Sequence, residues 1–216
     1  MSKYKAVLFD CDGTLVDTNS VILASWDHTF MTYLGRHVTP EEVLGTFGEP
    51  LEESMERIFA GIDPKQTVAT YRKFQYEYWD KEIEYFPGIA EMLAGLRKAG
   101  VKTGIVTSRY WESTAIRPFN LKDRDEYWPV IDPNSTDKKK PNPEPCLKAL
   151  EVLGMDKSEV LMVGDSKHDI ACGRNAGLKT VLVGWSLAYQ KEDATGMQIP
   201  DYTIETPEEL LEIVLG

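Results

Sequence analysis

The hydrophobic positions along this chain form two kinds of pattern, of which the first is a short apolar run that ends in small or polar residues. Residues 5–9 hold such a run, too short for a helix, directly before the turn-forming cluster Asp10-Cys11-Asp12-Gly13. Similar runs occupy residues 101–106, 128–131, 160–163 and 180–183. Runs of this length and composition predict buried β-strands.

Helical patterns separate these predicted strands. In the segment 89–96, apolar residues have the spacing of one helix face, at Ile89, Met92, Leu93 and Leu96. Further helices are predicted from Leu147, Leu150 and Leu153 and from residues 170–176. Buried strands that alternate with amphipathic helices are typical of a parallel sheet covered on both faces. We therefore predict an α/β fold whose core is a Rossmann-like parallel sheet with helices on both faces.

A different pattern fills residues 17–85, where no comparable strand run occurs and apolar residues follow helical spacing. The predicted helix faces are Val21, Ile22, Ser25, Trp26 and Phe30; Val43 and Phe47; and Tyr71, Phe74, Tyr78 and Trp79. We predict a discontinuous core domain of residues 1–16 and 86–216, with an inserted helical cap domain of residues 17–85. Because the insertion follows the first strand, we expect it above the carboxyl ends of the strands, where open α/β sheets bind ligands and where a lid would act.

The charge of the chain argues against one class of partner. Of its 216 residues, 35 are Asp or Glu and 24 are Lys or Arg, so the formal net charge is −11. Such a composition lacks the basic character that neutralises nucleic-acid phosphates. No apolar run approaches the roughly 20 residues that span a bilayer, and the first residues do not resemble a signal peptide. We therefore expect a cytoplasmic protein without nucleic-acid or membrane partners, with monomer and homodimer both left open.

Acidic and hydroxyl residues stand where the predicted strands end. They are Asp10 and Asp12 after the first strand, Thr107 and Ser108 after the second, and Asp165 and Asp169 after the strand at 160–163. Because parallel strands place their carboxyl ends at one edge of the sheet, we expect these side chains to converge. Crowded carboxylates repel one another unless a cation lies between them, and hard oxygen ligands favour Mg²⁺. The pattern predicts a divalent metal site.

Each of these residues also has a structural interpretation. Asp12-Gly13 is a common turn pair, Asp165 and Thr107 are typical residues for capping a helix, and a run such as Lys138 to Lys140 is usually a solvated loop. Taken together, these residues favour the catalytic interpretation, because each of these strand ends carries a residue type that phosphoryl transfer uses.

Four segments resemble the motifs of the haloacid dehalogenase-like hydrolases. Asp10-Cys11-Asp12-Gly13-Thr14-Leu15 is similar to the first motif, D-x-D-G-T-L. Thr107 resembles the second motif, Lys140 before Pro141 the third, and Gly164-Asp165-Ser166 with Asp169 the fourth. The motifs stand in the family's order. The resemblance covers the whole chain, with residues 17–85 corresponding to the family's cap.

The resemblance implies catalysis through an aspartyl-phosphate. Asp10 would be the nucleophile, and Asp12 would protonate the leaving oxygen and later activate water. The side chains of Thr107 and Lys140 would hold the phosphoryl oxygens, with backbone N–H groups near Gly13 and Ser108 as further donors. Mg²⁺ would be bound by Asp10, the backbone carbonyl of Asp12 and Asp165, with Asp169 as a direct or indirect partner. Lys140 is chosen for its Lys-Pro pair, and Lys138 and Lys139 remain alternatives.

Two branches of the family are disfavoured. Dehalogenation needs no acid at the position of Asp12, and phosphonate cleavage needs a cap lysine, whereas residues 17–64 contain no lysine. We predict a Mg²⁺-dependent phosphohydrolase for a small anionic phosphate, either inorganic pyrophosphate or a phosphoglycolate-type monoester. A sugar-phosphate mutase similar to β-phosphoglucomutase and a non-catalytic binding module of the same fold remain alternatives.

Substrate-specificity residues are predicted from the loop at residues 45–51 and from the residue that directly follows Thr107-Ser108. Residues 45–51 resemble the specificity loop of phosphoglycolate phosphatases, although an ordinary helix connection fits them equally well. Residues 184–187 are among several stretches that resemble the bacterial pyrophosphatases. Gly48, Glu49 and Arg109 are the candidate specificity residues, with Arg72 and Lys73 as other possible phosphate ligands.

No chemical role is predicted for the cysteines or for His168. Cys11, Cys146 and Cys172 are widely spaced, which favours reduced thiols over disulfides or a zinc site. His168 lies between Asp165 and Asp169, but Mg²⁺ prefers oxygen ligands, so we expect a neighbour rather than a ligand.

Overall fold

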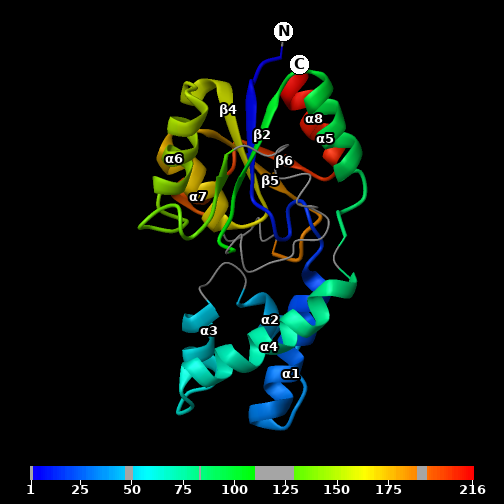
Figure 1. The fold of residues 1–216 in the computed structure, drawn as a ribbon, viewed down its shortest axis with the longest axis vertical. Coiled ribbons are helices and arrows are strands. Elements are labelled where there is room, and N and C mark those ends of the chain that lie inside the picture. The colour runs from blue at the N-terminus through cyan, green and yellow to red at the C-terminus, as the bar shows by residue number, and fades with distance from the viewer. Residues whose placement is uncertain (1, 47–50, 83, 110–128, 189–193) are drawn as a thin grey trace. The chain divides into compact units, whose positions relative to one another are not determined.

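The computed structural model describes residues 2–46, 51–82, 84–109, 129–188 and 194–216 (Figure 1). These residues form two compact units. One unit comprises Met1–Asp17 and Glu84–Gly216, and the other comprises Thr18–Ile83. No helix in the described part of the chain is long and apolar enough to cross a membrane.

The larger unit is built on a parallel β-sheet. Within the described residues the strands are β1 Ala6–Phe9, β2 Lys102–Val106, β3 Val130–Ile131, β4 Val160–Gly164, β5 Lys179–Val183 and β6 Tyr202–Ile204. Their order in the sheet is β3-β2-β1-β4-β5-β6, and every neighbouring pair is parallel. The central strands β1 and β4 are fully buried, as their apolar runs predicted.

Helices cover both faces of this sheet, which confirms the predicted α/β fold. They are α5 Ile89–Lys98, α6 Glu144–Leu153, α7 Lys167–Ala176 and α8 Pro207–Leu215. Figure 1 shows α5 and α8 on one face and α6 and α7 on the other. Short 3₁₀ turns at Lys157–Glu159 and Gly196–Gln198 complete the described elements of this unit.

The buried face of α6 differs from the predicted one. Leu147 is 47% exposed, whereas Cys146 and Ala149 are fully buried. Leu150 and Leu153 do pack against the core. At about 100° per residue, leucines spaced by three positions spread over about 120° of the helix surface, so they cannot all face the sheet. The small side chains of Cys146 and Ala149 face the core instead.

Two elements near the C-terminus were not predicted. Strand β6 has only three residues and is half-exposed at the sheet edge, so its apolar signal is weak. Helix α8 did carry a start signal, because Thr206 precedes Pro207 at the first helical position and acidic residues follow in the first turn.

The smaller unit is helical in its described part. Its helices are α1 Asn19–Leu34, α2 Pro40–Leu44, α3 Leu51–Ile58 and α4 Pro64–Glu82. Its core is formed by Trp26, Phe30, Val43, Met55, Phe59 and Tyr71. Trp26 packs edge-on against Tyr71 with ring centroids 5.2 Å apart. Phe47 and the side chains of Tyr78 and Trp79, which were predicted on these faces, lie outside the described residues.

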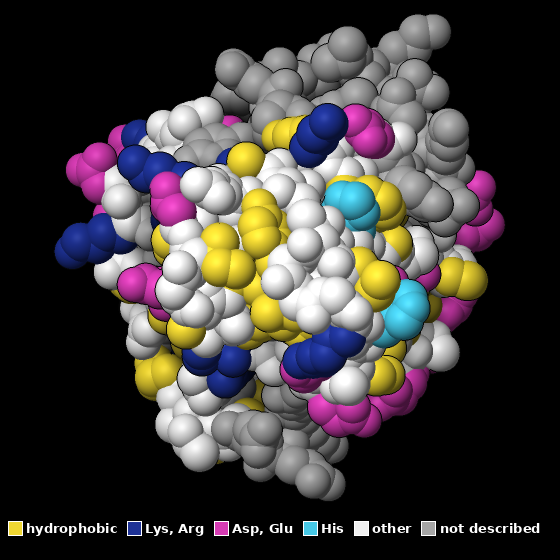
Figure 2. All heavy atoms as spheres, turned by 90° about the horizontal axis from the view of Figure 1, so that it is seen from below, with side chains coloured by type: hydrophobic (Ala, Val, Ile, Leu, Met, Phe, Trp, Pro, Cys, Tyr) yellow, Lys and Arg dark blue, Asp and Glu magenta, His cyan; other side chains and the backbone are white. Residues whose placement is uncertain are grey.

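Apolar side chains also reach the surface of the smaller unit. Met31 and Leu34 of α1 and Tyr76 of α4 are each 42–48% exposed. In the face shown in Figure 2, apolar and uncharged groups occupy the centre and charged side chains lie around them.

Candidate active site

The register of the sheet brings together the chain segments that follow β1 and β4. Phe9 at the end of β1 lies opposite Ile105 of β2 and Val163 of β4. The backbone N–H of Asp10 donates to Val163 at 2.9 Å, so the chain after β1 leaves the sheet beside the end of β4. Because β1 lies between β2 and β4, the residues that follow all three strands begin at the same edge.

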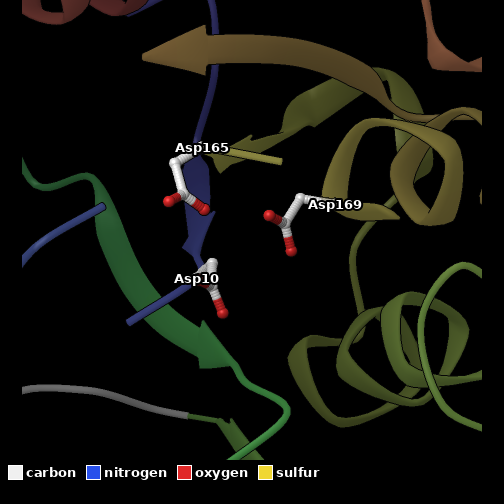
Figure 3. A group of neighbouring side chains, drawn as sticks. All are labelled: Asp10, Asp165 and Asp169. Atoms are coloured by element: carbon white, nitrogen blue, oxygen red, sulfur yellow. The ribbon is translucent and has the colours of Figure 1, made fainter. Parts of the chain in front are cut away.

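Three carboxyl groups meet at this edge (Figure 3). Asp10 follows β1, Asp165 follows β4, and Asp169 stands in the first turn of α7. One oxygen from each lies within 4.8 Å of the others, and all three residues are buried. Three buried carboxylates with converging oxygens fit a hard divalent cation such as Mg²⁺. His168 is not part of this group.

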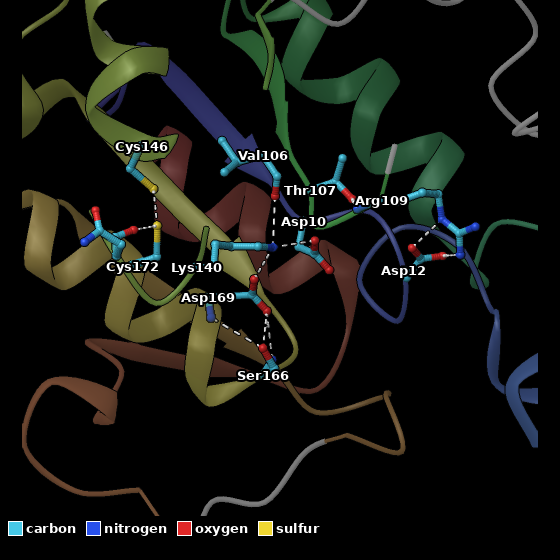
Figure 4. A network of polar contacts seen from close by, with 11 residues as sticks. Asp10, Asp12, Val106, Thr107, Arg109, Lys140, Cys146, Ser166, Asp169 and Cys172 are labelled. Atoms are coloured by element: carbon cyan, nitrogen blue, oxygen red, sulfur yellow. Dashed lines mark hydrogen bonds and ion pairs between the residues drawn. The ribbon is translucent and has the colours of Figure 1, made fainter. Parts of the chain in front are cut away.

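Lys140 lies among these acids (Figure 4). Its Nζ donates to Oδ1 of Asp10 at 2.7 Å, to Oδ1 of Asp169 at 2.5 Å and to the carbonyl of Val106 at 3.1 Å. Its side chain is only 5% exposed, whereas Lys138 and Lys139 are exposed. Of the three adjacent lysines, Lys140 is therefore the one whose ammonium group reaches the carboxylates.

The electrostatics of the site favour a bound cation. Burial raises the pKa of Asp10 to about 7; the charge of Lys140 opposes this rise, and those of Asp169 and Asp12 add to it. Burial, reinforced by the charges of Asp169 and Asp10, also holds the pKa of Asp165 well above its usual value. For Lys140, burial acts against the ammonium form, but the charges of Asp10 and Asp169 outweigh it and raise the pKa. A divalent cation would relieve the repulsion that disfavours the ionised carboxylates.

Asp12 is not part of this group of three acids and pairs with Arg109. The guanidinium donates Nε to Oδ2 of Asp12 at 2.6 Å and Nη2 to Oδ1 at 2.7 Å, a two-pronged pairing of residues 97 positions apart. The backbone N–H of Arg109 donates to Oγ1 of Thr107 at 3.1 Å, so Thr107 also stabilises its own turn. The structure thus brings Arg109 to the general-acid candidate. Ser108 is exposed beside it.

Two glycines allow the loops to approach closely. Gly13 has a φ of 76°, and a Cβ there would lie 2.0 Å from Oδ2 of Asp165. A Cβ on Gly164 would lie 2.3 Å from the Cβ of Asp169. Gly13 was predicted as a turn residue with backbone N–H donors nearby, and the structure shows that it also gives Asp165 room beside the first loop.

The segment after β5 supplies two contacts that the sequence did not indicate. Ser186 Oγ donates to Oδ2 of Asp165 at 2.6 Å, and Trp185 Nε1 donates to the carbonyl of Thr14 at 3.1 Å. One sequence signal could have indicated that this segment lies near the site: it follows a predicted strand, as Asp165 does. Asp169 is fixed separately, because Ser166 donates to its Oδ2 from the backbone N–H at 3.1 Å and from Oγ at 2.6 Å.

The remaining predicted residues lie elsewhere. Gly48 and Glu49 are outside the described residues. Arg72 pairs with Glu52 in the smaller unit. The three cysteines are free and buried, with the Sγ atoms of Cys146 and Cys172 3.4 Å apart.

Comparisons with known proteins agree on one family. The family model described as haloacid dehalogenase-like hydrolase matches residues 7–183. Pyrophosphatase PpaX of Halalkalibacterium halodurans is 40% identical over 212 residues, covering 96% of this chain and 95% of the relative. Pyrophosphatase PpaX of Bacillus mycoides is 37% identical over 216 residues, covering 98% and 97%. A crystal structure from Lactobacillus plantarum, provisionally named a phosphoglycolate phosphatase, has a TM-score of 0.82 and 25% identity and covers 98% of this chain and 99% of its own.

Replacing Gly13 by alanine is expected to damage the site far more than an ordinary glycine substitution. Gly13→Ala adds a Cβ that overlaps Asp165, whereas Gly100→Ala, at a φ of 75°, meets nothing within 4 Å. Both variants bear the backbone cost of a left-handed alanine, ~1–2 kcal/mol. Thermal unfolding should therefore show a larger loss for Gly13→Ala, together with loss of the rise in midpoint that we expect from a divalent cation. Equal losses in the two variants would contradict the close packing against Asp165.

Magnesium is expected to stabilise the protein more at about pH 8 than at about pH 5. The pKa of Asp10 is about 7 in the folded protein against an ordinary 3.8. Without a cation, the folded state therefore binds a proton that the unfolded state has released, and its stability falls as the pH rises from about 4 to about 7. Mg²⁺ can replace that proton. Unfolding midpoints measured with and without Mg²⁺ at both pH values test this, and an increment that does not grow with pH would contradict it.

Proposed function

The chain belongs to the haloacid dehalogenase-like hydrolases and is a phosphatase of that family, and from this premise we propose that it hydrolyses inorganic pyrophosphate with Mg²⁺ through a phosphorylated Asp10. The observation that carries the proposed chemistry is the buried group of Asp10, Asp165 and Asp169 with Lys140 between two of its members. The choice of pyrophosphate is supported by the similarity to pyrophosphatases PpaX over nearly the full length of both chains.

In the proposed first step, a carboxylate oxygen of Asp10 attacks phosphorus. Lys140 binds Oδ1 of Asp10, which leaves Oδ2 available as the nucleophile. The bond between phosphorus and the leaving phosphate oxygen breaks as the bond to Asp10 forms, and Asp12 gives its proton to that leaving oxygen. A covalent intermediate replaces one difficult displacement by two easier ones.

In the second step, a water oxygen attacks the phosphorus of the aspartyl-phosphate. Asp12 accepts a proton from this water, the bond between phosphorus and Asp10 breaks, and inorganic phosphate leaves. Asp12 is then protonated and Asp10 is a carboxylate again, as both were in the substrate-bound enzyme before the first step. Asp12 suits both roles because it lies outside the buried group and is 25% exposed at its side chain.

The metal-binding residues in this proposal are Asp10, Asp165 and Asp169, together with the backbone carbonyl of Asp12. When bound, Mg²⁺ offsets the charge of these carboxylates and of the phosphate oxygens they approach. Lys140 and the hydroxyl of Thr107 bind the transferring phosphoryl group beside it.

Arg109 is the proposed ligand for the second phosphate of pyrophosphate. Its guanidinium already pairs with a carboxylate through two N–H groups, and the same geometry matches two phosphate oxygens. If Arg109 exchanged Asp12 for the second phosphate, Asp12 would be free to carry the proton that it must donate. Binding of the second phosphate and activation of the acid would thereby be coupled.

A second candidate is hydrolysis of a phosphoglycolate-type monoester. It is favoured by the similarity, over almost the whole fold, to the Lactobacillus plantarum protein. A carboxylate on such a substrate also suits the guanidinium of Arg109. The alternative as a sugar-phosphate mutase uses the same Asp10 and Asp12 but returns the phosphoryl group to sugar instead of to water.

Asp10→Asn is expected to reduce phosphate release from pyrophosphate by roughly 10³-fold or more, because the amide cannot act as the nucleophile. The exposed Asp137→Asn serves as the matched control and should keep wild-type activity. Values of kcat/KM for pyrophosphate, phosphoglycolate and glucose 1-phosphate rank the substrates. Activity that survives in Asp10→Asn refutes the nucleophile, and conversion of glucose 1-phosphate to glucose 6-phosphate without free phosphate supports the mutase.

Arg109→Gln is expected to raise the KM for pyrophosphate by about 10-fold or more, while the KM for p-nitrophenyl phosphate changes by less than about threefold. The difference follows because p-nitrophenyl phosphate has no second anionic group. Arg36→Gln is the control, since Arg36 makes a similar two-pronged pair with Glu42 in the smaller unit. Equal increases in KM for the two substrates would remove Arg109 from the second-phosphate site.

A further inference from the structure

The segment that follows β5 reaches one of the proposed metal ligands, and we propose that Ser186 is a positioning residue that orients the Asp165 carboxyl group for a divalent cation. The inference rests on the proposed metal dependence. Ser186 touches neither phosphorus nor the proposed nucleophile in this assignment, and it acts through Asp165.

The direction of the hydrogen bond is set by its surroundings. Ser186 Oγ lies 2.6 Å from Oδ2 of Asp165, and both residues are only 6% exposed. The backbone N–H of Ala188 donates to the same Oγ at 3.2 Å. With a cation bound, Asp165 is a carboxylate and can only accept, so in that state the serine proton points to Asp165. The hydroxyl is thereby used as donor and as acceptor at once, which restricts its rotation.

The sheet places this serine beside Asp165. Strand β5 pairs with β4, with Leu182 opposite Gly164, so the residues after the two strands begin side by side. Ser186 follows the end of β5 by three positions, and Asp165 follows β4 directly. Trp185 ties the same segment to the first loop, because its indole N–H donates to the carbonyl of Thr14. Ser186 is therefore held by its own strand and by the loop that carries Asp12.

Close packing leaves little freedom around the hydrogen bond. A Cβ on Gly13 would lie 2.0 Å from Oδ2 of Asp165 and 2.8 Å from Oγ of Ser186. The backbone of Gly13 thus lies directly against both oxygen atoms. Removal of the serine hydroxyl opens a space the size of a single oxygen atom in a buried position, and Oδ2 loses the donor that sets its orientation.

The charge of the donor matters as well as its position. Lys140 orients Asp10 and Asp169 with a full positive charge, which repels a metal ion nearby. Ser186 is neutral, so it can orient Asp165 without adding that repulsion. Across metalloproteins, residues that hydrogen-bond to metal ligands in this way commonly improve metal affinity by roughly 10- to 100-fold.

The test is Mn²⁺ binding, followed by the electron paramagnetic resonance signal of free Mn²⁺ and independent of any hydrolysis assay. Ser186→Ala is expected to weaken Mn²⁺ binding by roughly 10- to 100-fold, and Ser186→Thr, which keeps the hydroxyl, should stay within about threefold of wild type. Ser158→Ala is the matched control, since Ser158 Oγ makes a bond of the same 2.6 Å length to Asp156 at an exposed site. That variant should bind Mn²⁺ as wild type does.

The outcomes separate this inference from the proposed function. Wild-type Mn²⁺ affinity in a folded Ser186→Ala variant overturns the role of Ser186 alone. Absence of Mn²⁺ binding by the wild-type protein overturns the proposed metal dependence itself, and the role of Ser186 with it. If Ser186→Ala does not fold, Ser186→Cys is judged by the same criterion, because a thiol is a weak donor and should also reduce the affinity.

Discussion

The salt bridges from Lys140 to Asp10 and Asp169 are the interaction on which the candidate site depends. Three carboxyl groups lie buried within a few ångströms of each other, an arrangement that Coulomb repulsion and desolvation both oppose. Lys140 offsets part of that charge, and it is itself buried only because the acids surround it. Removing one partner from a buried ion pair typically costs about 3–5 kcal/mol, because an uncompensated charge is left behind. The lysine therefore stabilises the acidic site as well as taking part in its proposed chemistry.

The parallel sheet is what brings these groups together from distant parts of the chain. Asp10, Lys140, Asp165 and Ser186 come from four different segments that meet near the ends of β1, β4 and β5. The buried strands have no polar side chains to spare, so the chemistry is confined to the loops that follow them. Glycine at positions 13 and 164 lets these loops pack within contact of the acids. Fold and site thus impose the same requirement on the sequence at the ends of β1 and β4, which is a glycine beside acidic residues.

The sequence predicted the strands and acids well because both depend on local pattern. Asp10, Asp165 and Asp169 follow apolar runs, and the structure brings all three together. The side chain of Leu147 was assigned to the wrong face because leucine spacing alone does not reveal that Cys146 and Ala149 pack more closely. The contacts of Ser186 with Asp165 and of Arg109 with Asp12 could not be predicted, because they depend on strand order and on loop conformation rather than on periodicity.

The central position of β1 bears on how such a chain is assembled during synthesis. Strand β1 is made first, but its neighbours β2 and β4 are Lys102–Val106 and Val160–Gly164. A nascent chain therefore carries an apolar strand and its adjoining acids through about the first half of translation before β2 exists, and through about three quarters of it before β4 does. Pairings between such distant segments form slowly because the loop-closure entropy comes before the contacts that offset it. Until β4 has emerged, the helices within Thr18–Ile83 can fold locally. The edge of the sheet then carries the acids that follow β1 but not Asp165 and Asp169, so the proposed set of metal ligands is incomplete.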